Sequence, residues 1–277
     1  MSTGAFRADL LQGKVAFITG GSSGINQAIA TRYAALGARV VIVARDQGKL
    51  DNAAAALNAA RADTCLAISA DVRDGAAMDA AAAAGAKHFG GYDIVIAGAA
   101  GNFLGPADKL SSNAFAAVVD IDLKGTFHTF HACHARLKPR AHLIAISAPQ
   151  ATVAMPLQAH ACAAKAGIEA LVRTLAIEWG GIDGARVNAL SPGLVAGTVG
   201  AAIFCKAGGD QAVVSMQPIP RLATLEEVAD AAVFLACPLS DYMTGHTLAL
   251  DGGLTLVNSS ATAIAAAARA ALSQARR

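Results

Sequence analysis

A short apolar segment runs through a glycine-rich turn into a helix at Val15-Ala16-Phe17-Ile18-Thr19-Gly20-Gly21-Ser22-Ser23-Gly24-Ile25. The continuous apolar run predicts a buried strand, and residues 26–36 predict the helix. Glycines in such a turn allow a pyrophosphate to approach the backbone closely. The free N–H groups and the dipole at the helix N-terminus then favour the negative charge. The junction therefore predicts a nucleotide site, with an ordinary glycine-rich turn as the alternative. The candidate nucleotide-binding residues are Gly20, Ser22, Ser23, Gly24 and Ile25.

The same alternation of short strands and alanine-rich helices continues along almost the whole chain. Runs such as Val40–Val43 and Ile94–Ile96 are continuously apolar, which is typical of parallel strands covered on both faces. Helices between such strands imply right-handed crossovers and a doubly wound α/β sheet of about seven strands with helices on both faces. The strands are expected at Val15–Thr19, Arg39–Ala44, Cys65–Ser69, Asp93–Ala97, Ala141–Ser147, Arg186–Leu190 and Thr247–Leu250.

A single domain accounts for the 277 residues. Hydrophobic residues make up 55% of the chain and charged residues 15%, a balance that excludes a disordered or fibrous protein. No linker rich in proline or serine divides the sequence, and no internal repeat is visible. We expect one domain over residues 1–277, with a core at about 12–255 and a frayed surface helix at 261–277.

Charge and cysteine usage narrow the possible partners. The formal net charge of +2 is too small to indicate binding to nucleic acid or to an anionic membrane. The longest charge-free stretch, 141–164, contains two prolines and cannot form a spanning helix. The five cysteines lie far apart and are odd in number, so they predict reduced core thiols rather than disulfides or metal ligands. The start of the chain does not resemble a signal peptide, and we expect a cytoplasmic protein without a metal.

The residue after the second strand distinguishes the two common dinucleotides. A carboxylate there would bind the 2′-hydroxyl of NAD, whereas this chain has Ala44 followed by Arg45. A guanidinium suits the 2′-phosphate of NADP through its charge and its bidentate geometry. A solvated surface arginine is the alternative, since Asp46 beside it weakens the positive field. After the third strand, the carboxylate of Asp71-Val72 can accept a hydrogen bond from the adenine amino group.

Thr19-Gly20-x-x-x-Gly24, Asp71-Val72 and Ser191-Pro192-Gly193 together resemble the short-chain dehydrogenase/reductase family, over about residues 12–255. The resemblance implies one Rossmann-type domain that transfers hydride between a nicotinamide and a substrate. It also implies that a further group of residues binds the cofactor. Two positions depart from the family pattern: Asn26 stands at the third glycine, which normally allows close helix–strand packing, and Ala97 replaces the asparagine after the fourth strand. The implied cofactor residues are Ala97, Ala99, Lys165, Pro192, Gly193, Val195 and Thr198.

The family's catalytic Asn, Ser, Tyr and Lys are mostly replaced in this chain. Lys165 is present, but Ala161 stands four residues before it, Ala148 thirteen before that, and Asp122 stands at the asparagine position. Loss of the tyrosine acid costs a carbonyl reductase about 10² to 10⁴ in rate, roughly 3–5 kcal/mol of barrier. Reduction of a conjugated alkene differs, because the hydride goes to carbon and the charge spreads into a carbonyl. Stabilisation of that oxyanion and a held water molecule then suffice.

Three stretches carry a more specific resemblance, to one subgroup of the family: Ala99–Leu104, Asp120–Phe127 and Gln158-Ala159-His160-Ala161. They resemble the 2,4-dienoyl-CoA reductases, especially the peroxisomal type. The resemblance implies an acyl-CoA substrate, hydride delivery to C5, and protonation at C2 by water held between Asp122 and Lys165. It also implies a homotetramer, formed through helices around residues 110–135 and 160–180. The implied substrate-binding residues are Asn102, Phe103 and His160.

Several alternatives stay open at this point. The chain could be another short-chain reductase acting on a carbonyl, or a catalytically silent NADP-binding protein. Asp122 and Lys165 could form only a structural pair, and His160 could lie at the surface. His128, His131 and His134 are expected to serve packing or an interface rather than a metal. Residues 197–217 predict either a mobile substrate lid or a long loop.

Overall fold

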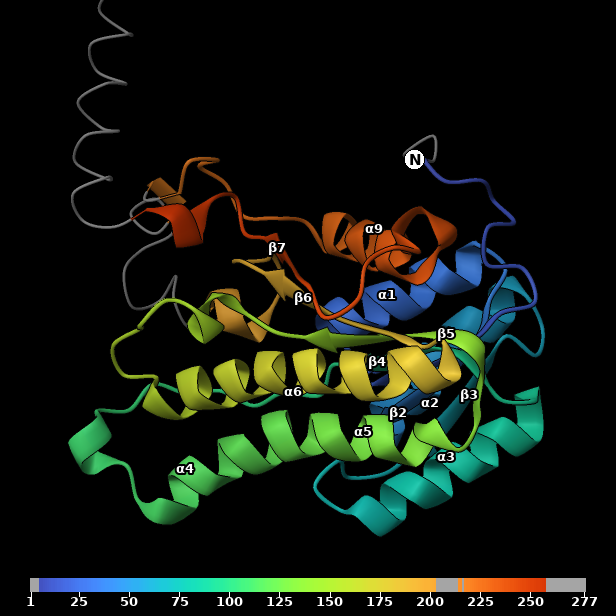
Figure 1. Cartoon of the computed structure of the whole chain (residues 1–277), viewed down its shortest axis with the longest axis horizontal. Helices are drawn as coiled ribbons and strands as arrows, with labels where there is room; N and C mark the ends of the chain where they lie inside the picture. Colours follow the sequence, from blue (N-terminus) through green and yellow to red (C-terminus); the bar gives the residue numbers. More distant parts are fainter. Residues whose placement is uncertain (1–4, 203–213, 216, 258–277) are drawn as a thin grey trace, which may run out of the picture.

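Seven parallel strands form one sheet in the order β3-β2-β1-β4-β5-β6-β7 in the computed structural model (Figure 1). The structure describes residues 5–202, 214–215 and 217–257. This strand order and the parallel pairing confirm the predicted doubly wound fold. The strands are β1 (Val15–Thr19), β2 (Arg39–Ala44), β3 (Cys65–Ser69), β4 (Tyr92–Ala97), β5 (Leu137–Ile146), β6 (Arg186–Pro192) and β7 (Thr247–Leu250).

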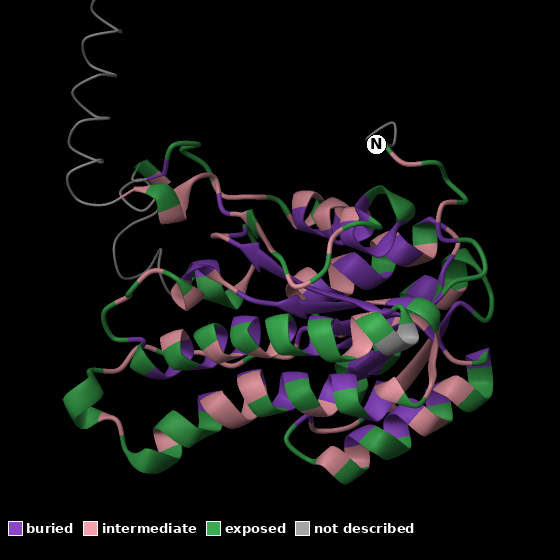
Figure 2. Cartoon of the chain, viewed as in Figure 1, coloured by how far each residue is buried: buried purple, intermediate pink, exposed green. Residues whose placement is uncertain are grey.

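Helices cover both faces of this sheet and divide the core into two halves. One half packs the strands against α1 (Gly24–Ala35), α2 (Gln47–Ala60) and α9 (Leu225–Ala236). The other half packs them against α3 (Gly75–Phe89), α5 (Gly125–His134) and α6 (Ala159–Asp183), with α4 (Ser112–Val119) leading into α5. Every residue of β1 is buried, and Figure 2 shows the strands as the buried layer between half-exposed helices. This arrangement explains why the central strands are apolar on both faces.

The main difference from the predicted strands lies in β5, which begins at Leu137 rather than Ala141. Its first part pairs with Tyr92 through a register shift, and Arg140 has a φ of 62°. Lys138 and Pro139 in this part are polar or unable to donate a ladder hydrogen bond, so they hid the strand from a reading based on apolar runs. The predicted tail at 261–277 lies outside the described residues, as do 203–213 and 216 of the predicted lid.

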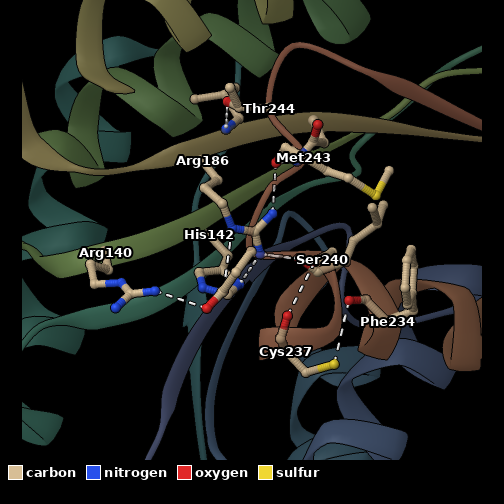
Figure 3. Close-up of polar contacts among 12 residues, drawn as sticks. Arg140, His142, Arg186, Phe234, Cys237, Ser240, Met243 and Thr244 are labelled. Carbon is tan, nitrogen blue, oxygen red and sulfur yellow. Dashed lines mark hydrogen bonds and ion pairs between the residues drawn. The ribbon is translucent and has the colours of Figure 1, made fainter. Parts of the chain in front are cut away.

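Arg186, the first residue of β6, connects four segments at the end of the sheet where the parallel strands begin (Figure 3). The Nη2 of Arg186 donates to His142 Nδ1 at 2.7 Å, to Leu235 O at 3.0 Å and to Ser240 Oγ at 2.9 Å. Nη1 donates to Met243 O at 2.9 Å. Burial, together with the neighbouring Arg186 charge, lowers the pKa of the His142 ring to about 4. The ring is therefore a neutral acceptor at pH 7.

Within the described ranges, no helix is both long and apolar enough to cross a membrane.

His142 should make the protein less stable as the pH falls through the window between its unfolded and folded pKa values. The unfolded chain binds a proton near pH 6.5, whereas the folded ring resists protonation until about pH 4. This group's contribution to stability is therefore present above pH 6.5 and declines below it. Between pH 7 and pH 5 we expect it to remove about 2 kcal/mol from the free energy of unfolding. Urea titrations at both pH values measure the change.

His142→Asn is the matched variant, because an amide oxygen can still accept from Arg186 but does not titrate. The difference in stability between pH 7 and pH 5 should be smaller in His142→Asn than in the parent. An equal pH dependence in the two proteins would show that His142 is not the group responsible.

Candidate active site

The turn between β1 and α1 has the geometry that a pyrophosphate requires. Gly20 and Gly24 adopt positive φ values of 71° and 56°, which favour glycine. Ser23, the N-cap of α1, makes no side-chain capping bond, whereas Asp46 and Asp74 cap α2 and α3. The first N–H groups of α1 are thus left for a ligand, and the helix dipole favours an anion there. The predicted Gly20, Ser22, Ser23, Gly24 and Ile25 all lie in this turn or at the start of α1, and they fit the phosphates of a dinucleotide.

Asn26, which replaces the third glycine of the fingerprint, fills the space between this turn and the loop after β4. Its Nδ2 donates to Gly98 O at 2.7 Å, and a Cβ added at Gly98 would overlap its Oδ1. A Cβ at Gly20 would lie 2.8 Å from its Nδ2. Asn26 and Gly98 are therefore sterically matched, and the amide ties the phosphate turn to the neighbouring loop. Asn26 Oδ1 is buried and has no hydrogen-bond partner among the described residues.

The adenosine end of the site lies beyond β2 and β3. The side chain of Arg45 is exposed and has no ion pair or hydrogen bond within the described part of the chain. The carboxylate of the neighbouring Asp46 caps α2, where it accepts from Lys49 N at 3.1 Å. Asp71 is held by Arg73 Nε at 3.0 Å, and this hydrogen bond keeps the pKa of Asp71 below its usual value. The guanidinium of Arg45 is thus available to an anionic ligand.

A cavity of about 560 Å³ lies at the carboxyl ends of the strands, between the phosphate turn and the start of α6. It brings together Asp122, Lys165 and the predicted Ile25, Asn102, Pro192, Gly193, Val195 and Thr198. Ala97 and Ala99 are not among its lining residues, although the backbone of Ala99 lies against Gly20. The remaining walls are largely apolar. They include Met155, Leu194, Val199, Ala201 and Leu254.

Asp122 and Lys165 form a buried ion pair in the wall of this cavity. Lys165 Nζ lies 3.0 Å from Asp122 Oδ2, and the two side chains are 10% and 2% exposed. Asp122 Oδ1 accepts from Gly101 N at 2.8 Å, while Lys165 Nζ donates to Ile146 O at 3.1 Å. Asp122 lies on a π-helical turn (Asp120–Lys124) between α4 and α5, and such irregular turns often occur at functional sites. The pairing inferred from the family resemblance is thus confirmed.

No tyrosine lines the cavity. The chain has three tyrosines. Tyr33 and Tyr92 are buried in the core and donate to backbone carbonyl groups, while Tyr242 is fully exposed. Ser147 does line the cavity, but its Oγ donates to the buried Glu169 Oε1 at 2.9 Å. Thr198, the other hydroxyl on the wall, donates to Val195 O at 2.7 Å. Among the described residues, the cavity therefore presents no free hydroxyl group that could act as the acid in carbonyl reduction.

The structure separates the three predicted substrate residues. Asn102 lines the cavity. Phe103 and His160 do not, and their rings instead pack together with centroids 4.4 Å apart. His160 is fully buried, which rules out the surface position considered as an alternative, and its ring nitrogens have no hydrogen-bond partner in the described ranges.

Sequence reasoning identified Asn102 but missed the two glutamines that are joined to it by hydrogen bonds at the cavity wall. Gln158 Oε1 accepts from Asn102 Nδ2 at 2.8 Å and from Gln150 Nε2 at 3.1 Å. Gln150 lines the cavity, whereas Gln158 is 1% exposed and lies behind the wall. Because Asn102 and Gln158 are 56 residues apart, no local motif joins them.

The three regularly spaced histidines serve packing. His128 Nδ1 lies 2.8 Å from Val72 O, which occupies the predicted position after β3. His131 packs on Phe127, and His134 packs on Trp179. Within the described residues, no group of three or more His, Cys, Asp or Glu side chains is arranged to hold a metal ion.

Comparison with known proteins identifies relatives over almost the whole length. A family profile described as enoyl-(acyl carrier protein) reductase matches residues 20–255. The chain is 44% identical to a peroxisomal 2,4-dienoyl-CoA reductase of the (3E)-enoyl-CoA-producing type from Rattus norvegicus, over 91% of this chain and 88% of that protein. It is 35% identical to a probable 2,4-dienoyl-CoA reductase of the (2E)-enoyl-CoA-producing type from Bacillus subtilis (strain 168), over 88% and 97% of the two chains.

A solved structure of a short-chain dehydrogenase from Bacillus anthracis has a TM-score of 0.80 and 35% identity, covering 90% of this chain and 99% of that one. The fold and the relatives agree with the resemblance first seen in the motifs. The rat relative is named as a peroxisomal enzyme, whereas the cytoplasmic location of this chain stays a prediction.

The fit between Asn26 and Gly98 predicts a strong coupling between the two positions. Gly98→Ala places a methyl group against the amide and should lower the free energy of unfolding by about 1–3 kcal/mol. In an Asn26→Gly background the amide that this methyl group would overlap is gone, so most of the loss in stability should disappear. Denaturant unfolding of the two single variants and the double variant gives the coupling energy. Additive effects would contradict the steric match.

Proposed function

The chain belongs to the short-chain dehydrogenase/reductase family, and from this premise we propose that it is an NADPH-dependent 2,4-dienoyl-CoA reductase. The observation that carries the proposal is the buried Asp122–Lys165 pair in the wall of an apolar cavity that no tyrosine lines. Such a site suits addition of hydrogen across conjugated carbons better than reduction of a ketone.

The choice of NADPH rests on Arg45. Its guanidinium follows β2, where the ribose 2′ position of a bound dinucleotide is expected, and it has no ion pair within the described ranges. A planar, permanently charged donor group suits a 2′-phosphate. The bound nicotinamide would supply the hydride.

The missing hydroxyl acid is consistent with conjugate reduction. Hydride addition at C5 of a 2,4-dienoyl thioester moves negative charge through the conjugated carbons to the thioester oxygen. A proton then adds to C2, which leaves one double bond between C3 and C4 and gives a 3-enoyl-CoA. No alkoxide forms, so the tyrosine acid of carbonyl reductases is not required.

Asp122 and Lys165 hold the water that delivers this proton in our proposal. Each carboxylate oxygen of Asp122 accepts one hydrogen bond from the protein and retains a second acceptor position. Lys165 uses two of its three N–H donors on Asp122 and Ile146, so one remains for the cofactor ribose or for the water. The positive charge of Lys165 also stabilises negative charge on the substrate.

The apolar walls fit an acyl chain. Met155, Val199 and Leu254 lie on different segments of the cavity wall, and a methionine side chain adapts readily to chains of different shape. We infer that the thioester end lies beside Asp122 and Lys165, with the acyl chain along these apolar residues.

A homotetramer is also part of the proposal. The helices around 110–135 and 160–180, which the family resemblance implies as contacts, present exposed Phe115, Phe127 and Ile177. Apolar side chains of this size on neighbouring helix faces are consistent with a subunit interface.

The purified protein should oxidise NADPH in the presence of a 2,4-dienoyl-CoA, as measured by loss of NADPH absorbance. Asp122→Asn keeps an acceptor for Gly101 but removes the charge, and Lys165→Met removes the ammonium. Each should lower kcat by about 10² to 10⁴. Absence of turnover with dienoyl thioesters of short, medium and long chains would refute the assignment.

Asp120→Asn and Lys124→Met are the matched controls. These two residues lie on the same π-helical turn and form their own exposed ion pair at 2.9 Å, away from the cavity lining. Both controls should retain kcat within about twofold. Full activity in Asp122→Asn would contradict the role of the pair even if the parent protein is active.

A further inference from the structure

The proposed reduction places negative charge on the thioester oxygen, and an enzyme must supply a hydrogen-bond donor there. Ala148 and Ala161 stand where the family pattern normally has Ser and Tyr, so neither side chain can donate. Lys165 has one remaining N–H, which is needed for the cofactor or the water. The donor for the oxygen has to be sought among the other polar side chains of the cavity, and this inference rests on the proposed function.

Three of these polar side chains already donate a hydrogen bond to another part of the protein. Ser147 Oγ donates to Glu169, and Thr198 Oγ1 donates to Val195 O at 2.7 Å. Asn102 donates to Gln158, and its Oδ1 is sealed from solvent without a partner in the described part of the chain. Asn102 Nδ2 keeps a second N–H, but the carbonyl oxygen of this amide is enclosed in the wall, whereas neither amide atom of Gln150 is buried without a partner.

Gln150 differs from them because it is only half-buried and lines the open cavity. One N–H of its Nε2 donates to Gln158 Oε1 at 3.1 Å, which leaves the second N–H free. The reverse orientation of the Gln158 amide would set its NH₂ against the NH₂ groups of both Gln150 and Asn102, so the carbonyl oxygen of Gln158 faces these two donors. One N–H of Gln150 therefore remains for a ligand.

The surroundings of Gln150 hold its amide in place before substrate binds. It lies on a single 3₁₀ turn, Pro149–Ala151, closed by Ala151 N→Ala148 O at 3.0 Å and Val153 N→Pro149 O at 2.9 Å. Its partner Gln158 is buried and is fixed from the other side by Asn102. A donor fixed in this way need not reorganise when charge develops on the substrate.

We propose that Gln150 is a catalytic residue whose Nε2 donates a hydrogen bond to the thioester carbonyl oxygen of the substrate. The same contact strengthens as hydride arrives and charge accumulates on that oxygen. Gln158 and Asn102 are positioning residues, since they act through Gln150 and do not touch the oxygen. The amide group thereby replaces the hydroxyl donors that the family normally places nearby.

Steady-state kinetics and a difference spectrum test this role. Gln150→Leu keeps the approximate size but removes both N–H donors, and Gln150→Glu keeps the shape with acceptor oxygens only. Either should lower kcat about 10²-fold, the usual effect of losing one oxyanion donor, with a smaller change in KM. Hydrogen bonding to the carbonyl should also shift the dienoyl thioester absorption to longer wavelength in the complex of the parent protein with NADP⁺, and both variants should lose this shift.

Thr152→Val is the matched control, because Thr152 follows the same turn but is not among the cavity residues. It should retain both kcat and the spectral shift. NADPH titration and a thermal melt of each variant separate loss of the donor from loss of the fold. Gln150→Glu serves as the second variant if Gln150→Leu proves unstable.

The assignment is overturned if an active parent protein and a folded Gln150→Leu variant show the same kcat and the same shift. In that case the proposed function survives. A parent protein that turns over no dienoyl-CoA refutes the proposed function instead, and the role of Gln150 with it.

Discussion

The buried ion pair between Asp122 and Lys165 sets the chemistry of this site. Removing two charges from water costs several kcal/mol each, so such a pair persists only where the geometry and additional hydrogen bonds compensate. Gly101 N supplies that bond to the carboxylate and Ile146 O accepts from the ammonium. Four elements therefore meet at one point: the loop after β4, the π-helical turn that carries Asp122, the end of β5 and the first turns of α6.

The turn between β1 and α1 departs from the family fingerprint but keeps the geometry that a phosphate requires. Gly20 and Gly24 keep the backbone geometry, and α1 keeps an uncapped N-terminus. Asn26 stands at the third glycine position, which normally allows close packing of helix and strand. The larger side chain fits because Gly98, across the gap, has no side chain. A substitution that weakens the fingerprint in the sequence is thus accommodated by a second position 72 residues away.

The order of elements could be predicted from the sequence because parallel buried strands are apolar throughout and the helices between them are long. The start of β5 could not, since Pro139 and Arg140 break the apolar pattern at a bulge. Asp122 and Lys165 were identified only by family resemblance, because residues 43 positions apart carry no spacing signal of their own. Asn102 was predicted as a substrate residue, but its hydrogen bond to Gln158 and the role of Gln150 were missed for the same reason: hydrogen bonds between distant segments depend on tertiary structure. His160 was predicted near the substrate, whereas packing with Phe103 encloses it.

The proposed reaction depends on one central claim: solvent, held by Asp122 and Lys165, delivers a proton to carbon and not to oxygen. Reduction of a 2,4-dienoyl-CoA in D₂O with unlabelled NADPH tests it directly, with the position of deuterium in the product read by NMR. The account predicts one deuterium at C2 of a 3-enoyl-CoA and none at C5. Deuterium at C4 of a 2-enoyl-CoA, or an alcohol as the product, would contradict it.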